Sequence, residues 1–267
     1  MSLRHSFARG LYRVVRDRAP WLRGRQRLAH LATPWLASKH PLRVTSYGLR
    51  FELDLSEHVE EQIFWEDYDR HIMTWWPDEM APGRVFLDVG ANVGLYSLVA
   101  AARGATVVAF EPNPRTRARL HANIRLNDLE SRITVRPEAL IDLVGTATLF
   151  DDVREGQRDA NAGVASLSNK NAAGRSIEVQ TSTLDAIVEE LHLARVDWIK
   201  MDIQGAEYPA LKGGSKTLAG KPKLLLEIEP EIAKNMGWTV EDLERFLRDL
   251  GYSLRKLDSL NVVAEPN

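Results

Sequence analysis

Short apolar segments alternate with helical segments from residue 85 onward, and this alternation restricts the fold more than any other feature of the sequence. The spacing of apolar residues predicts helices at 92–102 and 114–127. Strands that are apolar along their whole length are buried on both faces, as in a parallel sheet with helices on either side. We therefore expect an α/β fold with a mostly parallel sheet over residues 85–267. The predicted strands are 85–88, 106–110, 133–135, 196–201 and 223–229, with weaker signals at 145–150 and 262–263.

Charge divides the first 80 residues into two segments of opposite sign. Residues 1–50 contain eleven Lys and Arg against one acidic residue, a net charge of +10. Residues 51–80 contain ten acidic residues against Arg70 alone, a net charge of −9. Such an asymmetry predicts two surfaces with different partners, or one segment folded onto the other. We therefore separate a basic helical segment at 1–45 from a segment at 46–84 that precedes the sheet.

The basic segment has apolar residues at helical spacing, namely Leu3, Phe7, Leu11, Val14 and Val15. A positively charged amphipathic helix is typical of proteins that bind an anionic membrane surface or an acidic partner. An ordinary surface helix that packs on its own protein has the same pattern. Both interpretations remain open, and an anionic membrane surface is kept as a candidate partner of residues 1–45.

The segment at 46–84 begins with the alternating apolar and polar residues of a strand at 49–55 and continues with an acidic, aromatic stretch. We expect this segment to form a cap or lid over the ligand-binding side of the sheet, with the basic segment outside it. Its aromatic side chains would then stack on the substrate, or they would pack on an outer helix. The aromatic residues concerned are Trp65, Tyr68, Trp75 and Trp76.

Composition excludes several classes of site. The chain has no cysteine, so it contains no disulfide, no thiolate nucleophile and no zinc site built on sulfur. No apolar run approaches the roughly 18 residues of a membrane-spanning helix. Arginines interrupt the N-terminus where a signal peptide would be apolar. We expect a soluble cytoplasmic protein, with a peripheral location at the membrane left open by the basic segment.

The segment from Asp88 to Gly94 lies between the first predicted strand and a helix. Gly90 permits a tight turn, and Gly94 lets the helix pack closely on the sheet. Doubly wound sheets bind ligands at the carboxyl ends of their strands. The segment therefore predicts a ligand site, although a tight strand-to-helix connection without a ligand has the same pattern.

Glu111 follows the second strand, 23 residues after Asp88. A carboxylate at this position accepts hydrogen bonds from both hydroxyls of a ribose, which also occurs in NAD enzymes. The loop, however, is not G-x-G-x-x-G, and Asp88 would repel a pyrophosphate. The same acid suits the amino group and sulfonium of S-adenosylmethionine. We therefore expect S-adenosylmethionine as the cofactor and keep an NAD-dependent oxidoreductase as the alternative.

A third constellation follows the fourth strand. Asp202 comes just after this strand, at the same edge of the sheet as Gly90, and Gly205 provides another turn. Glu207 opens the next helix, where an acidic residue either contacts a ligand or simply stabilises the helix N-terminus. Asp202 is the better placed of the two acids to face the ligand.

Four segments together resemble the FkbM-type methyltransferases. They are 86–94, 109–114, 182–185 and 199–207, and the resemblance covers roughly residues 85–230. It implies a Rossmann-like class I methyltransferase fold and O-methylation of a hydroxyl on a sugar, glycan or polyketide-like small molecule. Carried over position by position, it implies that Glu138 and Ala139 flank the adenine and that Asp202 lines the site. The cofactor would be held by Asp88, Gly90, Asn92, Gly94, Glu111 and Asn113.

Methyl transfer to a hydroxyl requires that its proton be removed. Asp202 is the first candidate for the base, and Glu227 and Glu229 after the fifth strand come next. Mg²⁺ bound to Asp202 is an alternative, but no second ligand can be identified, so a metal is left unassigned. An inactive, cofactor-binding partner protein remains a further alternative.

Two other features bear on partners and the site. The core lacks the Asn-Pro-Pro-aromatic or Asp-Pro-Pro-aromatic motif of amino-directed DNA methyltransferases, so no nucleic-acid substrate is expected. Residues 151–175 are polar, without periodicity, and predict a long loop of the kind that is often functional. The oligomeric state and the identity of the acceptor are not predicted by the sequence.

Overall fold

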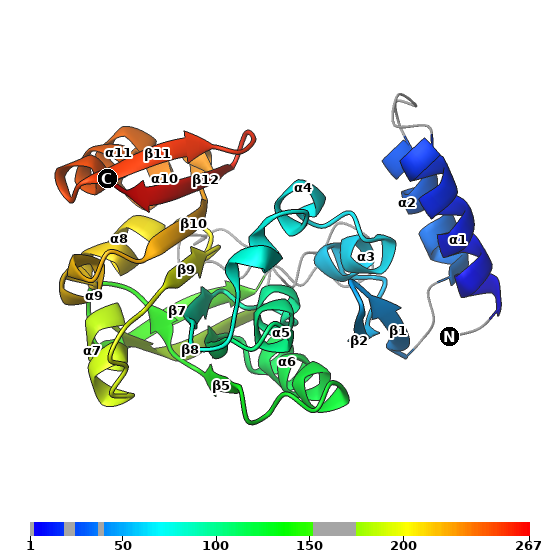
Figure 1. The fold of residues 1–267 in the computed structure, drawn as a ribbon, viewed down its shortest axis with the longest axis horizontal. Helices are drawn as coiled ribbons and strands as arrows, with labels where there is room; N and C mark the ends of the chain where they lie inside the picture. The colour runs from blue at the N-terminus through cyan, green and yellow to red at the C-terminus, as the bar shows by residue number, and fades with distance from the viewer. Residues whose placement is uncertain (1–2, 19–24, 37–39, 152–174) are drawn as a thin grey trace.

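A seven-stranded sheet forms the centre of the protein (Figure 1). The computed structural model describes residues 3–18, 25–36, 40–151 and 175–267. The strand order is β11-β12-β10-β9-β3-β4-β5; the five strands from β10 to β5 are parallel, and β12 is antiparallel to both of its neighbours. The predicted Rossmann-like, mostly parallel sheet is therefore confirmed. Its strands are β3 (Val85–Val89), β4 (Thr106–Phe110), β5 (Ile133–Arg136), β9 (Trp198–Met201), β10 (Lys223–Glu227), β11 (Tyr252–Lys256) and β12 (Asn261–Pro266).

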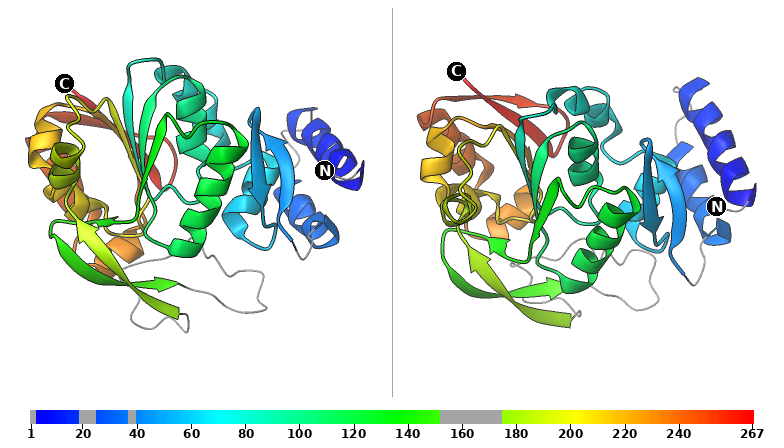
Figure 2. Two further views of the ribbon diagram at one scale, coloured as in Figure 1. Left: turned by 90° about the horizontal axis from the view of Figure 1, so that it is seen from below. Right: turned by 60° about the horizontal axis from the view of Figure 1, so that its bottom comes forward.

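Helices cover both faces of this sheet, because consecutive strand residues point to opposite sides. Phe86 packs in a core with α5 (Leu95–Ala102) and α6 (Pro114–Leu126). Its neighbour Leu87 belongs to the core on the other face. Figure 2 shows the helices on either side of the sheet. The second face is covered by α7 (Leu184–Glu190), α8 (Glu207–Lys212), α9 (Ser215–Ala219), α10 (Pro230–Asn235) and α11 (Val240–Asp249).

The first helix after β3 begins three residues later than expected. The apolar periodicity predicts a start at Asn92, but α5 begins at Leu95. Asn92 has a φ of 51° and Gly94 a φ of 98°. Both values lie in the left-handed region, which cannot continue a right-handed helix. The residues after β3 therefore form a loop at the end of the strand, and this loop contributes to the site.

Some predicted strands have other bounds or partners. The segment predicted at 223–229 ends at Glu227, because α10 begins at Pro230, and the segment predicted at 196–201 begins at Trp198. The segment at 145–150 is β7 (Gly145–Asp151), which lies in a separate sheet with β8 (Arg175–Ser182) and β6 (Ala139–Leu140). The long loop expected at 151–175 lies outside the described residues except for its two ends.

The two N-terminal helices pack against the segment at 46–84, which we call the cap, and together they continue the core on the α5 side of the sheet. Figure 1 shows two helices at one end of the molecule, followed by a hairpin and a third helix. The hairpin pairs residues 42–46 with residues 49–53, so the boundary expected at residue 45 falls inside its first strand. Each helix is too short or too polar, within the described residues, to cross a membrane. The elements are α1 (Leu3–Arg18), α2 (Arg25–Leu36), β1 (Leu42–Ser46), β2 (Leu49–Leu53), α3 (His58–Trp65), α4 (Arg70–Met73) and the 3₁₀-helix η1 (Trp76–Glu79).

Candidate active site

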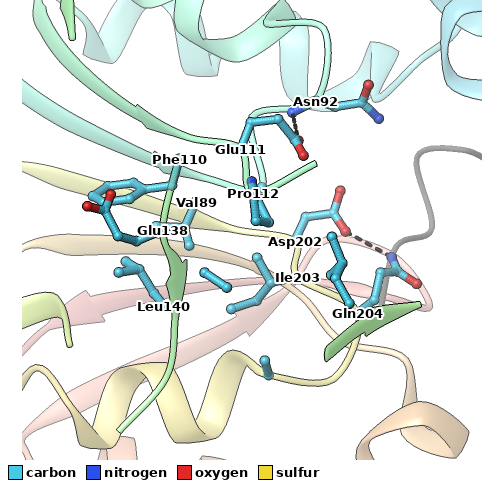
Figure 3. A pocket seen from close by; sticks show the side chains of 14 residues that line it. Val89, Asn92, Phe110, Glu111, Pro112, Glu138, Leu140, Asp202, Ile203 and Gln204 are labelled. Atoms are coloured by element: carbon cyan, nitrogen blue, oxygen red, sulfur yellow. Dashed lines mark hydrogen bonds between the residues drawn. The ribbon is translucent and has the colours of Figure 1, made fainter. Parts of the chain in front are cut away.

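A cavity with about 640 Å³ of empty space lies at the carboxyl ends of β3, β4 and β9 (Figure 3). This space includes the open mouth of the cavity, and the edge is the one at which doubly wound sheets bind ligands. The cavity brings together residues from all three predicted constellations. Its lining consists of Val89, Gly90, Asn92, Phe110, Glu111, Pro112, Glu138, Ala139, Leu140, Leu149, Asp202, Ile203, Gln204 and Ala206.

Gly90 allows the loop after β3 to lie directly against the end of β9. A Cβ at this position would be only 2.0 Å from the carbonyl oxygen of Asp202, and the φ of Gly90 is +82°. The backbone N–H groups of Gly90 and Ala91 both donate to the carbonyl of Phe110 at the end of β4. The loop is therefore held between the two neighbouring strands, and glycine is required there for space as well as conformation.

Glu111 is fixed in the cavity wall by two backbone donors. Its Oε2 accepts from the Asn92 N–H at 3.0 Å, and its Oε1 accepts from the Asn113 N–H at 2.9 Å. Burial raises the pKa of Glu111 to about 7, although these two hydrogen bonds oppose the effect. A carboxyl group so placed changes charge near neutral pH. Figure 3 shows it at the same end of the cavity as Asp202, with Phe110, Glu138 and Leu140 at the other end.

Three of the predicted cofactor residues lie behind the cavity wall. Asp88 is fully buried, accepts a hydrogen bond from the Ser97 hydroxyl at 2.5 Å, and has one carboxylate oxygen without a partner among the described residues. Gly94 lies at the start of α5, close to Leu120. Asn113 caps α6 by accepting from the Arg115 N–H. These residues position the loops, and only Asp88 has an unpartnered polar atom.

Glu138 and Ala139 form another wall of the cavity. The Glu138 carboxylate accepts two hydrogen bonds from the Arg136 guanidinium, at 2.7 and 3.0 Å. Arg136 also pairs with Glu190 on α7 at 2.7 Å. The acidic side chain is therefore fixed in position beside the apolar Leu140 and Leu149.

Asp202 is surrounded by three side-chain donors. Its Oδ1 accepts from Gln204 Nε2 at 3.0 Å, and its Oδ2 lies 3.3 Å from Lys200 Nζ and accepts from the Tyr68 hydroxyl at 3.4 Å. Burial lowers the pKa of the Lys200 ammonium, but Asp202, Asp88 and Glu227 outweigh burial and raise it above its usual value. Lys200 therefore stays protonated and offsets the negative charge around it.

Glu227 belongs to the same cluster although it does not line the cavity. Repulsion by Asp202, followed by burial, raises the pKa of Glu227 to about 9. Asp69 accepts a hydrogen bond from the Tyr96 hydroxyl at 2.8 Å, and burial raises the pKa of Asp69 as well. Closely spaced carboxyl groups cannot all be ionised at neutral pH. Glu227 therefore holds a proton under these conditions.

The cap contributes to this cluster through Tyr68 and Asp69. Trp65 instead packs edge-on against Tyr12 and Phe64, and Trp76 packs against Phe86 and Tyr96. Both indoles are at least 96% buried. The expectation that these two tryptophans stack on a substrate is wrong, because the apolar core already covers them.

The remaining cap aromatic and Glu207 also have structural partners. Trp75 lies against Trp198, with ring centroids 6.4 Å apart. Glu207 accepts from the backbone N–H groups of Ile203 and Gly205, so it closes the loop after Asp202. Of the four aromatic residues expected over the substrate, Tyr68 alone reaches Asp202.

Sequence reasoning missed Lys200 and the contacts of Asp69 and Tyr96. Lys200 stands inside the motif that contains Asp202, and a lysine in an otherwise apolar strand is a signal that could have been used. The Asp69–Tyr96 pair depends on how the cap folds. Among the described residues, no group of three His, Asp or Glu side chains is arranged to hold a metal ion.

Comparisons with known proteins match these features to one family. The model of the methyltransferase FkbM domain matches residues 88–254. The AMB antimetabolite synthetase AmbE of Pseudomonas aeruginosa is 30% identical over 82% of the chain, and the hexuronic acid methyltransferase AglP of Haloferax volcanii is 26% identical over 74%. The 2-O-methyltransferase NoeI of Sinorhizobium fredii is 29% identical over 51%. The chain spans 12% of AmbE, 77% of AglP and 60% of NoeI.

Proposed function

Because the chain belongs to the FkbM methyltransferase family, we propose that it transfers a methyl group from S-adenosylmethionine to a hydroxyl oxygen of a sugar, glycan or polyketide-like small molecule. The observation that carries this proposal is one cavity that is lined by both Glu111 and Asp202. The first carboxyl group is suited to hold a cofactor, and the second is suited to take a proton. Similarity to AglP, a hexuronic acid methyltransferase, and to NoeI, a 2-O-methyltransferase, supports an oxygen acceptor on a sugar.

The residues around the cavity fit S-adenosylmethionine. Glu111 would accept hydrogen bonds from the ribose hydroxyls, and Glu138 and Ala139 would flank the adenine beside Leu140 and Leu149. Asp88, buried behind the cavity wall with one carboxylate oxygen that has no described partner, would favour the positive charge of the methionine end through its electrostatic field rather than by contact. The same negative charge disfavours a pyrophosphate, so it supports the methyl donor over NAD.

Asp202 would act as the general base. S-adenosylmethionine, when bound, would supply a methyl group on a positively charged sulfur for transfer to the acceptor oxygen. The proton of the acceptor hydroxyl would pass to the Asp202 carboxylate. Gln204 and Tyr68 orient this carboxylate, and Lys200 offsets its charge. Glu227, protonated at neutral pH, would donate a hydrogen bond within the cluster rather than accept the proton.

The cap would help to exclude water from the transfer. Tyr68 lies between the end of α3 and α4 and reaches Asp202, a residue 134 positions away in the chain. Water exclusion strengthens the interactions that position the acceptor and prevents competing proton transfers. A cap that contacts the base directly is therefore suited to closing the acceptor side of the cavity.

Two measurements test this function. Titration calorimetry should detect binding of S-adenosylmethionine by the purified protein, weakened in Glu111→Ala, and no comparable binding of NAD. S-adenosylhomocysteine should then be released in the presence of sugar or glycan hydroxyl acceptors. Binding of NAD in place of S-adenosylmethionine would support the oxidoreductase alternative. Cofactor binding without release across a broad panel of acceptors would support an inactive partner protein.

A further inference from the structure

Helix α1 presents its apolar residues away from the protein. Four large apolar side chains follow one face at helical spacing, and their exposed fractions are 89% for Leu3, 73% for Phe7, 56% for Leu11 and 54% for Val14. The neighbouring α2 adds Leu31 and Trp35, which are 70% and 82% exposed. Figures 1 and 2 show α1 and α2 side by side at the end of the molecule away from the C-terminal strands. We call these six side chains the outer apolar face.

The opposite face of α1 is polar and is the face that packs on the protein. His5 Nε2 is hydrogen-bonded to the Leu36 carbonyl at 2.8 Å. The Arg9 guanidinium, 6% exposed, donates to the Thr45 carbonyl and pairs with Glu66 at 3.2 Å. Tyr12 donates to Asp67 and packs against Trp65. A helix that packed only on its own protein would turn its apolar side inward, so this orientation leaves the outer apolar face available for another surface.

Charge identifies the surface that fits best. Residues 1–50 have a net charge of +10, and the Arg4 side chain is exposed on the same helix as the apolar stripe. Two copies of this segment would repel each other if they met face to face. A lipid bilayer with anionic headgroups has an apolar interior for the exposed apolar side chains and negative charge for the basic ones. We propose that the outer apolar face docks on an anionic lipid bilayer, with Arg4 at the level of the headgroups.

This arrangement is independent of the methyl-transfer chemistry. The outer apolar face lies on α1 and α2, whereas the cavity is formed at the ends of β3, β4 and β9. A lipid surface would therefore retain the protein at the membrane without occupying the site. The exposed Trp35 is suited to the boundary between headgroups and acyl chains, where indoles are enriched.

Vesicle co-sedimentation with purified full-length protein tests the proposal. Wild type should sediment with vesicles of phosphatidylcholine and phosphatidylglycerol, bind poorly to phosphatidylcholine alone, and dissociate as salt increases. Phe7→Ser/Trp35→Ser should bind the anionic vesicles about tenfold or more weakly, because two large apolar side chains no longer enter the bilayer. Arg4→Glu should weaken binding to the anionic vesicles and leave the weak binding to phosphatidylcholine vesicles unchanged. None of these residues contributes to the cavity, so cofactor affinity should be unchanged.

The matched control replaces exposed apolar residues elsewhere. Leu143 and Val144 are each 67% exposed in the connection between β6 and β7, and Leu143→Ser/Val144→Ser should bind vesicles as wild type does. Absence of vesicle binding by wild type, or equal binding by Phe7→Ser/Trp35→Ser, would overturn the proposal. Light scattering, which gives the molar mass in solution, tests whether a second copy covers the face instead. A stable wild-type dimer that does not bind vesicles and that dissociates in Phe7→Ser/Trp35→Ser would assign the face to a second copy.

Discussion

If Glu111 holds the ribose as we propose, it links the protonation state of the protein to cofactor binding. Its pKa is raised to about 7 by burial, whereas hydroxyl donors from a ribose stabilise the ionised carboxylate. Below the pKa the free protein must therefore lose a proton when the cofactor binds. We predict that affinity for S-adenosylmethionine falls by up to about tenfold per pH unit below roughly pH 7 and levels off above it. Titration calorimetry across this pH range provides the measurement.

Glu111→Gln is the control for this effect. The amide resembles the protonated acid in shape but does not titrate, so cofactor affinity should be weaker by roughly 1–3 kcal/mol at about pH 8 and should lose its dependence on pH through Glu111. A pH dependence that persists unchanged in Glu111→Gln would assign the titration to another group.

Asp202 and Glu227 are neighbouring carboxyl groups for which we predict different roles. Asp202→Asn should lower turnover by about 100-fold or more, the scale of a lost general base, with cofactor affinity nearly intact. Glu227 has its pKa raised to about 9 and is protonated near neutral pH. Glu227→Gln therefore preserves a neutral hydrogen-bonding group, and we expect turnover within a fewfold of wild type.

Steady-state kinetics of the two variants near pH 7 separate these roles. If Glu227→Gln loses as much turnover as Asp202→Asn, the proton is accepted by Glu227 or shared by the pair, and our assignment of Asp202 alone is wrong. Nearly normal turnover in Asp202→Asn would remove this carboxylate from the mechanism.

At the level of elements, the turn between β3 and α5 depends on the absence of a side chain at Gly90. A methyl group at Gly90 would meet the rigid backbone carbonyl of Asp202, whereas at Gly83, with nearly the same φ of +84°, it would meet nothing within 4 Å. We predict that Gly90→Ala destabilises the fold by about 2 kcal/mol or more beyond Gly83→Ala, which has only the conformational cost of about 1 kcal/mol. Denaturant unfolding of both variants measures the difference. Equal losses of stability in the two variants would mean that the loop at Gly90 moves away from Asp202 at little cost.

The elements predicted best are those whose signals are local. The apolar runs at β3, β4 and β10 are each contained in one short segment, so their alternation indicates the doubly wound sheet directly. The loops that follow β3 and β9 also contain their own glycine signals, which is why Gly90 and Asp202 are predicted near one edge, whereas Glu111 is predicted from its place directly after β4. The start of α5 was placed too early, because two left-handed residues leave the apolar periodicity unchanged.

The parts that were not predicted depend on contacts between distant segments. Strand β12 lies between β10 and β11 and is antiparallel to both, an order that depends on which strands pair and is not visible in the sequence of any one strand. Tyr68 meets Asp202, and Asp69 meets Tyr96, through the fold of the cap. Trp65 and Trp76 belong to an acidic, aromatic stretch whose composition is also typical of a substrate-binding segment. Only the packing of α1 and α5 around them shows that they are core residues.

Over the whole molecule, one apolar core extends from the N-terminal helices to the sheet. Tyr12 of α1 and Leu36 of α2 are buried in the same cluster as Phe64 of the cap and Phe86 of β3. The basic segment is therefore attached to the catalytic part through the cap. Movement of α1 and α2 would be transmitted first to α3, the helix that leads to Tyr68.

Glu66 is the residue that most directly holds the basic segment on the cap. It pairs with Arg9 and Arg13 of α1 and also accepts from the backbone N–H of Tyr47, while Arg9 is 6% exposed. Glu66→Gln removes the carboxylate that pairs with the buried guanidinium, so we predict a loss of about 1–3 kcal/mol in stability and faster tryptic cleavage within α1. Glu52→Gln breaks an exposed pair with Arg43 and should cost under about 1 kcal/mol. If Glu66→Gln resists cleavage as well as Glu52→Gln does, α1 is held by its apolar contacts through Tyr12 rather than by charge.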